Sequence, residues 1–296
     1  MTKEKTFYIV DVFAEEKFAG NQLAVVRDAA GLSDSDMQNI TKEMNYSETT
    51  FILSDDRNNG GYDVRIFTPA QEVPFAGHPT LGTAYIIQQE IIKEPLEKII
   101  LNLKVGQIPV TFNYVGKEKN VLRMKQIEPT FGQTIEPEQI SQVLGINTGD
   151  INERFPIQEV STGMFFIIVP LETLDAVKRA KIDKDKYFKL IENRQAKAIL
   201  VFCPETYSKE NDLNVRVFVD CYGIPEDPAT GSGNGCLAGY LVKHRYFGKD
   251  QIDIRTEQGY EIGRPSSLYL RAKDTKGQID ISVGGKVVMV AQGEFV

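Results

Sequence analysis

Two stretches of the chain decide the fold, because the second repeats the first: VRIFTPAQEVPFAGHPTLGTAYII (Val64–Ile87) and VRVFVDCYGIPEDPATGSGNGCLAGYLV (Val215–Val242). Arg65 and Phe67 recur as Arg216 and Phe218, and after a three-residue insertion Glu72, Pro74 and Gly77 recur as Glu226, Pro228 and Gly231. Each copy predicts a strand, a Pro/Gly turn and a helix of small and apolar residues. We expect two similar halves with both turns at one cleft, and we expect the chemistry where the copies differ.

The composition is that of an ordinary globular protein that acts on small molecules. The 296 residues carry a net charge of −7, from 34 basic and 41 acidic side chains, and no long basic block that would bind nucleic acid. The apolar run Phe165–Val169 is far too short to span a bilayer. The N-terminal residues lack a signal-peptide pattern and enter a strand at once, so we expect a cytoplasmic protein with no membrane partner.

Cysteine and histidine are too sparse for a structural metal site. Cys203, Cys221 and Cys236 are odd in number and have no CxxC spacing, which argues against a disulfide framework or zinc. With only His78 and His244 in the chain, a multi-histidine metal centre is excluded. Cys236 falls inside the second repeated helix, where we interpret it as a packing residue.

The pattern along the chain predicts an α+β fold. Many short, antiparallel-looking strands surround two central helices, expected at Pro79 to Gln89 and Gly233 to Lys243. The pattern is interrupted near Lys125 to Gln133, which places the boundary between residues 1–125 and 126–284. No linker is rich enough in Gly, Ser or Pro to indicate independent domains.

The two repeated turns are candidate anion sites. Gly231, Ser232 and Gly233 precede or begin a helix, and Gly77 and His78 do so in the first copy. Exposed N–H groups at a helix start attract a carboxylate or a phosphate. Neither turn has the GK[ST] of a nucleotide-binding loop or the setting of a dinucleotide fingerprint, so we expect a small carboxylate-bearing substrate. The alternative is a pair of ordinary helix caps.

Three ionisable residues are candidate catalytic groups. Glu48 lies at a helix–strand junction before apolar residues, where a carboxyl group has a raised pKa and can serve as an acid or base; the alternative is a solvated carboxylate or a cap. His78 can relay a proton or donate a hydrogen bond, or simply pack at a helix start. Asp227 precedes Pro228 and either forms a turn or orients a substrate amine. Aligning residues 165–169 with 50–53 places Gly163 opposite Glu48, so that one half alone supplies a carboxylate.

Five motifs give the chain a resemblance to a known family. IVDVFAEEKFAGNQLAVV, MNYSETTFI, FAGHPTLGTAYII, EDPATGSGNGCLAGYL and EQGYEIGRPS occur in the order found in the PhzF-like family, which shares the diaminopimelate epimerase fold. The resemblance runs from about Tyr8 to the C-terminal VGGKVVMVAQGEF. It implies two pseudo-symmetric halves, each a barrel-like, mostly antiparallel sheet around a central helix. It also implies that the final strand, residues 285–296, returns to the first half.

The resemblance further implies a cofactor-independent isomerase that is usually a homodimer. By motif, the family's catalytic glutamate corresponds to Glu48, its GHP histidine to His78, and its DPATGS aspartate and serine to Asp227 and Ser232. Related epimerases use two cysteines, and those positions correspond to Gly77 and Gly231 here. We therefore expect one carboxyl group to shift a proton on one face of a small amino- or hydroxy-carboxylate. The alternatives are a binding protein without catalysis and an amino-acid epimerase or racemase that uses Cys236.

Overall fold

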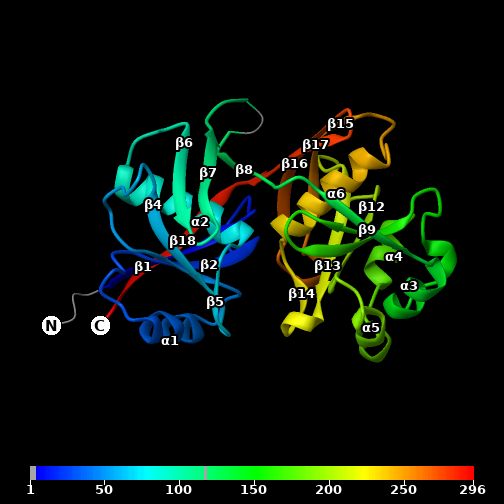
Figure 1. The fold of residues 1–296 in the computed structure, drawn as a ribbon, viewed down its shortest axis with the longest axis horizontal. Coiled ribbons are helices and arrows are strands. Elements are labelled where there is room, and N and C mark those ends of the chain that lie inside the picture. Colours follow the sequence, from blue (N-terminus) through cyan, green and yellow to red (C-terminus); the bar gives the residue numbers. More distant parts are fainter. Residues whose placement is uncertain (1–4, 117–118) are drawn as a thin grey trace. The chain divides into compact units, whose positions relative to one another are not determined.

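The computed structural model describes residues 5–116 and 119–296, and the chain forms two compact units (Figure 1). Unit 1 consists of Met1–Met124 with Gly284–Val296, and unit 2 of Lys125–Val283. The chain passes from one unit to the other within strands β8 and β17. Each unit combines a mixed sheet with helices, so the predicted α+β class is confirmed.

Unit 1 has one sheet whose strands pair in the order β18-β1-β2-β3-β4-β6-β7-β8, with β5 also on β4. The β2–β3 and β4–β6 pairs are parallel and the others antiparallel. Among the described residues of this unit the series does not close. The elements are β1 Lys5–Val12, β2 Asn21–Val26, α1 Asp34–Met44, β3 Thr49–Ile52, β4 Tyr62–Phe67, β5 Glu72–Val73, α2 Gly77–Ile86, the π-helix η1 Ile87–Ile92, β6 Lys98–Leu103, β7 Gly106–Asn113, β8 Val121–Lys125 and β18 Val287–Phe295.

Unit 2 repeats this plan, with pairing order β9-β10-β11-β12-β13-β15-β16 and β14 on β13. Its parallel pairs are β11–β12 and β13–β15, as in unit 1. The elements are β9 Thr130–Ile135, α3 Pro137–Leu144, η3 Thr148–Asp150, β10 Ile157–Ser161, β11 Phe165–Pro170, α4 Leu174–Arg179, α5 Lys184–Ile191, β12 Ala198–Cys203, β13 Leu213–Val219, η4 Asp220–Tyr222, β14 Ile224–Asp227, α6 Gly231–Lys243, β15 Gln251–Gln258, η5 Tyr260–Ile262, β16 Ser266–Thr275 and β17 Gln278–Gly285.

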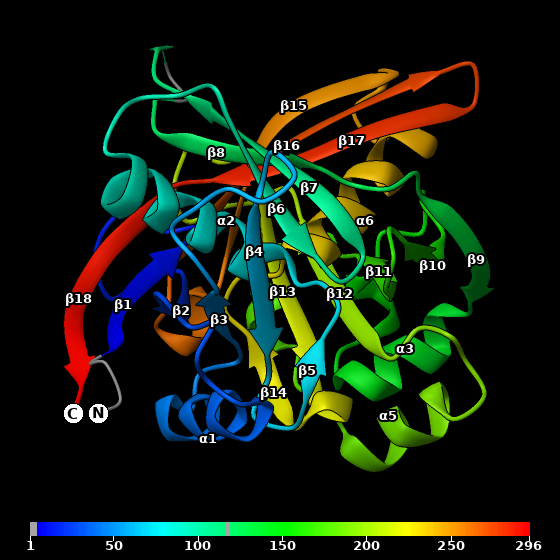
Figure 2. The same cartoon turned by 60° about the vertical axis from the view of Figure 1, so that its left-hand side comes forward.

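Each sheet curves around one central helix. In unit 1, α2 contacts β1, β2, β3, β6, β7 and β18; in unit 2, α6 contacts β10, β11, β15 and β16 (Figures 1 and 2). Both helices are buried almost all round, as a helix of small and apolar residues must be. A Cβ at Gly82 would lie 2.5 Å from Leu23 Cδ2, so glycine lets α2 lie directly on the sheet.

Further helices cover the other face of each sheet. In unit 1, Met37 of α1 packs with Val26, Phe51 and Phe67. In unit 2, α3, α4 and α5 pack against alternate residues of β11 and β12, including Ile167. Because both faces of β11 are buried, its sequence is continuously apolar rather than alternating. This explains the run FFIIV without any membrane role.

The two halves of the sequence repeat correspond in structure. Arg65 makes a two-pronged ion pair with Glu72 and lies over the Phe67 ring at 5.0 Å. Arg216 does the same with Glu226, and lies over Phe218 at 4.8 Å. Each pair ties the strand before the turn to the short strand after it, so each central helix starts from a fixed hairpin.

Some boundaries differ from those predicted. The helices α2 and α6 begin at Gly77 and Gly231, two residues before the predicted starts, so the glycines expected to form a turn are instead in the first helical turn. Glycine is tolerated there because its cost in backbone entropy applies mainly to the helix interior. The segment expected to interrupt the pattern near Gln133 contains β9, and β5, β10, β14 and α4 were not predicted.

Candidate active site

Glu48 and His78 lie side by side in unit 1. Glu48 comes just before β3, and His78 is the second residue of α2. Glu48 Oε2 is 3.4 Å from His78 Nε2, with both side chains largely buried. The side chains of Thr50 on β3 and Thr83 on α2 hydrogen-bond at 2.8 Å, which fixes the strand against the helix. The two catalytic candidates that the sequence placed in this half therefore meet.

His78 is a neutral imidazole at neutral pH. Burial lowers its pKa to about 3, and a hydrogen bond with the Gln22 backbone acts in the opposite direction. A bond that favours the charged ring is one in which the ring donates to a carbonyl oxygen. Since Nε2 faces Glu48, the donor is Nδ1, and the neutral ring presents Nε2 as an acceptor. Nε2 can thus accept a hydrogen bond from Glu48 when that carboxyl group carries a proton.

The structural counterpart of Glu48 in unit 2 is Ala198. Thr49 pairs with Phe67, and Ile199 pairs with Phe218, its repeat partner. The residues one step earlier are therefore Glu48 and the fully buried Ala198. The alignment that placed Gly163 opposite Glu48 was wrong, because the strand after Gly163, β11, occupies the position of β2 rather than of β3. The equivalent position in unit 2 has no ionisable group.

Asp227 is the last residue of β14 in unit 2, and it also has no acidic counterpart. It pairs with Val217, whereas the equivalent Ile66 pairs with Val73. Its Oδ2 accepts a 2.5 Å hydrogen bond from the hydroxyl of Thr230, the residue that precedes α6. Glu48 and His78 thus belong to unit 1 and Asp227 to unit 2, each at a position where the other unit has a different side chain.

The start of α6 presents backbone N–H groups. Gly231, Ser232 and Gly233 form its first turn, and among the described residues no side chain caps it. Thr230, which occupies the capping position, instead directs its hydroxyl to Asp227. Free N–H groups at the start of a 13-residue helix favour a carboxylate or phosphate. Gly77, at the start of α2, likewise follows an uncapped Ala76.

Cys236 is a poor acid–base group. It is completely buried in α6, where its Sγ lies 3.6 Å from Thr162 Oγ1. Burial raises the pKa of this thiol to about 12, so it stays protonated at neutral pH. The packing role expected from the sequence therefore agrees with its surroundings.

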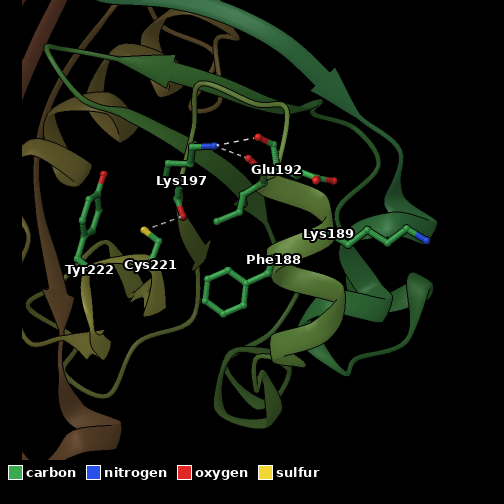
Figure 3. Close-up of a pocket in the computed structure, with 7 residues that line it drawn as sticks. Phe188, Lys189, Glu192, Lys197, Cys221 and Tyr222 are labelled. Atoms are coloured by element: carbon green, nitrogen blue, oxygen red, sulfur yellow. Dashed lines mark hydrogen bonds between the residues drawn. The ribbon is translucent and has the colours of Figure 1, made fainter.

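A hollow of about 680 Å³ lies in unit 2, against α5 and η4, and the candidate residues Asp227, Gly231, Ser232, Gly233 and Cys236 do not line it (Figure 3). Phe188, Ile191, Cys221 and Tyr222 give it an apolar lining. Its one inward-facing cation, Lys197, donates to the backbone oxygens of Ile191 and Glu192 at the end of α5. The lysine thus caps a helix, and we assign no function to this hollow.

The described residues contain no group of three or more His, Cys, Asp or Glu side chains that could hold a metal ion. No helix in the described part of the chain is long and apolar enough to cross a membrane.

The fold and these residues place the protein among epimerase-like two-unit α+β proteins. A solved structure of a probable proline racemase from Agrobacterium radiobacter shares this fold, with a TM-score of 0.63 at 9% identity, covering 99% of this chain and 93% of that one. The PhzF-family phenazine biosynthesis protein of Bacillus anthracis is much closer, with a TM-score of 0.90 at 27% identity and complete coverage of both chains.

The family model of phenazine biosynthesis-like proteins (PhzC-PhzF) matches residues 10–293, and the chain belongs to this family. It is 33% identical over 288 residues to trans-2,3-dihydro-3-hydroxyanthranilate isomerase of Pseudomonas aeruginosa, covering 97% of this chain and 98% of that protein. The resemblance found in the sequence is therefore confirmed.

Proposed function

We propose that the protein is a cofactor-independent isomerase that shifts a proton within a small amino- or hydroxy-carboxylate, with Glu48 as the single acid/base. The observation that carries this proposal is the pairing of Glu48 with neutral His78. Unit 2 has the buried Ala198 at the position that corresponds to Glu48. Two-base epimerisation needs an acid–base group on each side of the substrate carbon. One carboxyl group instead suits removal and return of a proton on the same face of the substrate.

The proposed reaction needs no external oxidant or reductant. The Glu48 carboxylate takes a proton from an acidic C–H bond, the electron pair moves into the adjacent unsaturated system, and the protonated carboxyl group returns the proton to another carbon. His78 Nε2 accepts a hydrogen bond from Glu48 while it holds the proton. In this scheme Asp227 orients the substrate's amine or relays a proton. Ser232 and the N–H groups of Gly77, Gly231 and Gly233 bind its carboxylate.

The substrate class follows from the family and from these binding groups. The Pseudomonas aeruginosa relative is named for trans-2,3-dihydro-3-hydroxyanthranilate, which carries a carboxylate, an amine and a hydroxyl group. The helix start in unit 2 suits the carboxylate, and Asp227 suits the amine. We use this compound as the test substrate and its aromatic analogue, 3-hydroxyanthranilate, as a binding probe that has no such proton to shift.

The Glu48→Gln variant tests the acid/base role. We expect it to lower turnover by roughly 10²- to 10⁴-fold or more, because a carboxamide can neither take nor return the proton. Binding of 3-hydroxyanthranilate should stay within about threefold, since the amide keeps the size of the side chain. Turnover in D₂O, followed by NMR, should place deuterium in the part of the product for which the Glu48 carboxyl proton exchanges with solvent before its return.

Glu43→Gln is the matched control, because Glu43 is an exposed residue of α1. It removes the same charge and should leave turnover unchanged. Retained activity in Glu48→Gln contradicts the single-glutamate mechanism, whereas product without deuterium means that Glu48 returns the same proton before it exchanges. A protein that binds 3-hydroxyanthranilate but turns over no amino- or hydroxy-carboxylate would instead be the non-catalytic binding protein.

We also propose a cytoplasmic homodimer. Three free cysteines, two of them buried, suit a reducing compartment. Sedimentation of the purified protein tests the dimer directly, and a monomer at micromolar concentration contradicts it.

A further inference from the structure

A buried glutamine organises the residues around Asp227. Gln258, at the end of β15, is fully buried. Its Nε2 donates to the Asp227 backbone oxygen at 2.8 Å and to Thr230 Oγ1 at 3.0 Å. Its Oε1 accepts from the Thr230 backbone N–H at 3.2 Å and from Asn234 Nδ2 at 2.9 Å. The amide thus uses both donors and both acceptor positions on the segment from Asp227 to the first turns of α6.

These hydrogen bonds determine which partner the hydroxyl group of Thr230 donates to. Gln258 Oε1 is held by two donors, so its Nε2 must face Thr230 Oγ1 and donate to it. A hydroxyl group that accepts from an amide still has one proton to give, and the carboxylate 2.5 Å away receives it. Oδ2 of Asp227 is therefore held in place through Thr230 by Gln258.

The fold does not require this chain of bonds. In unit 2, Thr256, Glu257 and Gln258 pair with Leu213, Asn214 and Val215. In unit 1, Leu101 and Asn102 pair with Tyr62 and Asp63, and the same register places Leu103 opposite Val64, the repeat partner of Val215. Leu103 is therefore the counterpart of Gln258. Ala76 precedes α2 as Thr230 precedes α6. Val73 stands where unit 2 has Asp227.

Unit 1 thus builds the same hairpin and central helix from Leu103, Ala76 and Val73, three apolar residues. Burying a polar network is favourable only when every member is satisfied, and an apolar set at the same positions evidently suffices for the fold. The network must therefore be explained by what it does for Asp227.

We propose that Thr230 and Gln258 are positioning residues that fix the Asp227 carboxylate for the substrate's amino group. This inference rests on the binding role proposed for Asp227. A carboxylate whose rotation is already fixed loses less freedom when it accepts a hydrogen bond from that amino group, and this raises affinity without a new contact. The two residues act through Asp227 and do not themselves contact the reacting atoms.

Two substitutions at Thr230 separate positioning from packing. Thr230→Val keeps the shape and removes the hydroxyl group, whereas Thr230→Ser keeps the hydroxyl group and removes a methyl. We expect Thr230→Val to weaken 3-hydroxyanthranilate binding, measured by calorimetry, by roughly 10- to 100-fold, as expected for loss of a hydrogen bond to a charged group. Thr230→Ser should stay within about threefold. A packing role predicts the reverse order and would overturn the proposal.

Further variants guard against misfolding. Thr230→Ala reproduces the residue that unit 1 has before α2, so the fold tolerates it, and its affinity should fall as in Thr230→Val. Thr256→Val is the matched control: Thr256 donates to Asn234 at 2.8 Å in the same network, and its hydroxyl group bonds Asn234 rather than Asp227. The Thr256→Val variant should bind 3-hydroxyanthranilate with unchanged affinity. Without ligand, NMR should show faster exchange of the Gln258 side-chain N–H groups in Thr230→Ala, and unchanged exchange contradicts the network.

A double-mutant cycle distinguishes this inference from the proposed function. Asp227→Asn should itself weaken binding by at least about tenfold, and adding Thr230→Val to it should cost little more, because both changes remove one interaction. If Asp227→Asn binds as tightly as the unmodified protein, the binding role of Asp227 is wrong. If Asp227→Asn weakens binding and Thr230→Val alone does not, the binding role of Asp227 stands and the positioning inference is overturned.

Discussion

The ionisation of His78 makes the stability of the fold depend on pH. Its pKa falls from 6.5 in the unfolded chain to about 3 in the folded protein, because burial penalises the charged ring. Above pH 6.5 neither state binds this proton, and the full stability is present. Below pH 6.5 the unfolded chain binds the proton while the folded protein does not, so stability falls until the pH passes the folded pKa.

The free energy of unfolding should therefore decrease by about 1.4 kcal/mol per pH unit on account of this one histidine between about pH 6 and pH 3. We expect His78→Gln to lose that part of the slope. Urea denaturation of both proteins from pH 4.5 to 7 measures it as a difference. The comparison removes the contribution of His244, whose pKa burial also lowers. Parallel curves for the two proteins would show that His78 is charged in the folded state.

Among the elements, the two hairpins before the central helices offer a matched pair for mutation. Arg216 is more deeply buried than Arg65, and its guanidinium also donates to the backbone oxygens of Val177 and Ala180. When Arg65 is replaced, Glu72 keeps a second partner, Lys104. When Arg216 is replaced by methionine, Glu226 stays buried without the guanidinium that pairs with it.

We expect Arg216→Met to destabilise the protein by about 3–5 kcal/mol, the cost of breaking a buried pair. Arg65→Met, at the less deeply buried pair, should cost only about 1 kcal/mol. Thermal unfolding of the two variants under one set of conditions gives the comparison. Equal losses of stability in the two variants would mean that the depth of burial does not determine how much each ion pair stabilises the protein.

The sequence predicted the central helices and the strands that precede them, and it missed several short elements, two of them inside the repeat. The central helices, β4 and β13 were expected because local similarity at matched offsets identifies them. By contrast, β5 has two residues, and β9 begins beside Pro129, so neither has a period that a sequence pattern can reveal.

Two features of the site needed tertiary structure. The residues TFIL and FFIIV look alike as apolar strands, yet one belongs to β3 and the other to β11, and only the pairing register shows that Glu48 corresponds to Ala198. Gln258 is a polar residue in a strand, and nothing local indicates that its side chain is buried. Its contrast with Leu103 at the matching position is the signal that a register-based alignment of the halves would have found.

For the whole molecule, the two ends of the chain belong to one unit. The strand β18 pairs with β1 along its length, from Lys5 opposite Phe295 to Val12 opposite Val287 (Figure 2). The rings of Phe7 and Phe295 lie 4.8 Å apart, and α2 contacts β18 as well. Unit 1 is therefore complete only when β18 has been made, whereas the pairings of β10 to β13 in unit 2 lie within residues 125–283.

Removing residues 287–296 should consequently affect the units unequally. We expect hydrogen exchange, followed by mass spectrometry, to show loss of protection in β1, β2 and α2, because β1 loses its partner and α2 loses part of its cover. Strands β11 to β13 should keep their protection. Removing only residues 294–296 is the control, since it leaves most of the β1–β18 pairs, and it should change exchange near the ends of the two strands alone. Equal loss of protection in both units after the longer truncation would show that they unfold as one cooperative body, in which case β18 stabilises unit 2 as much as the sheet it joins.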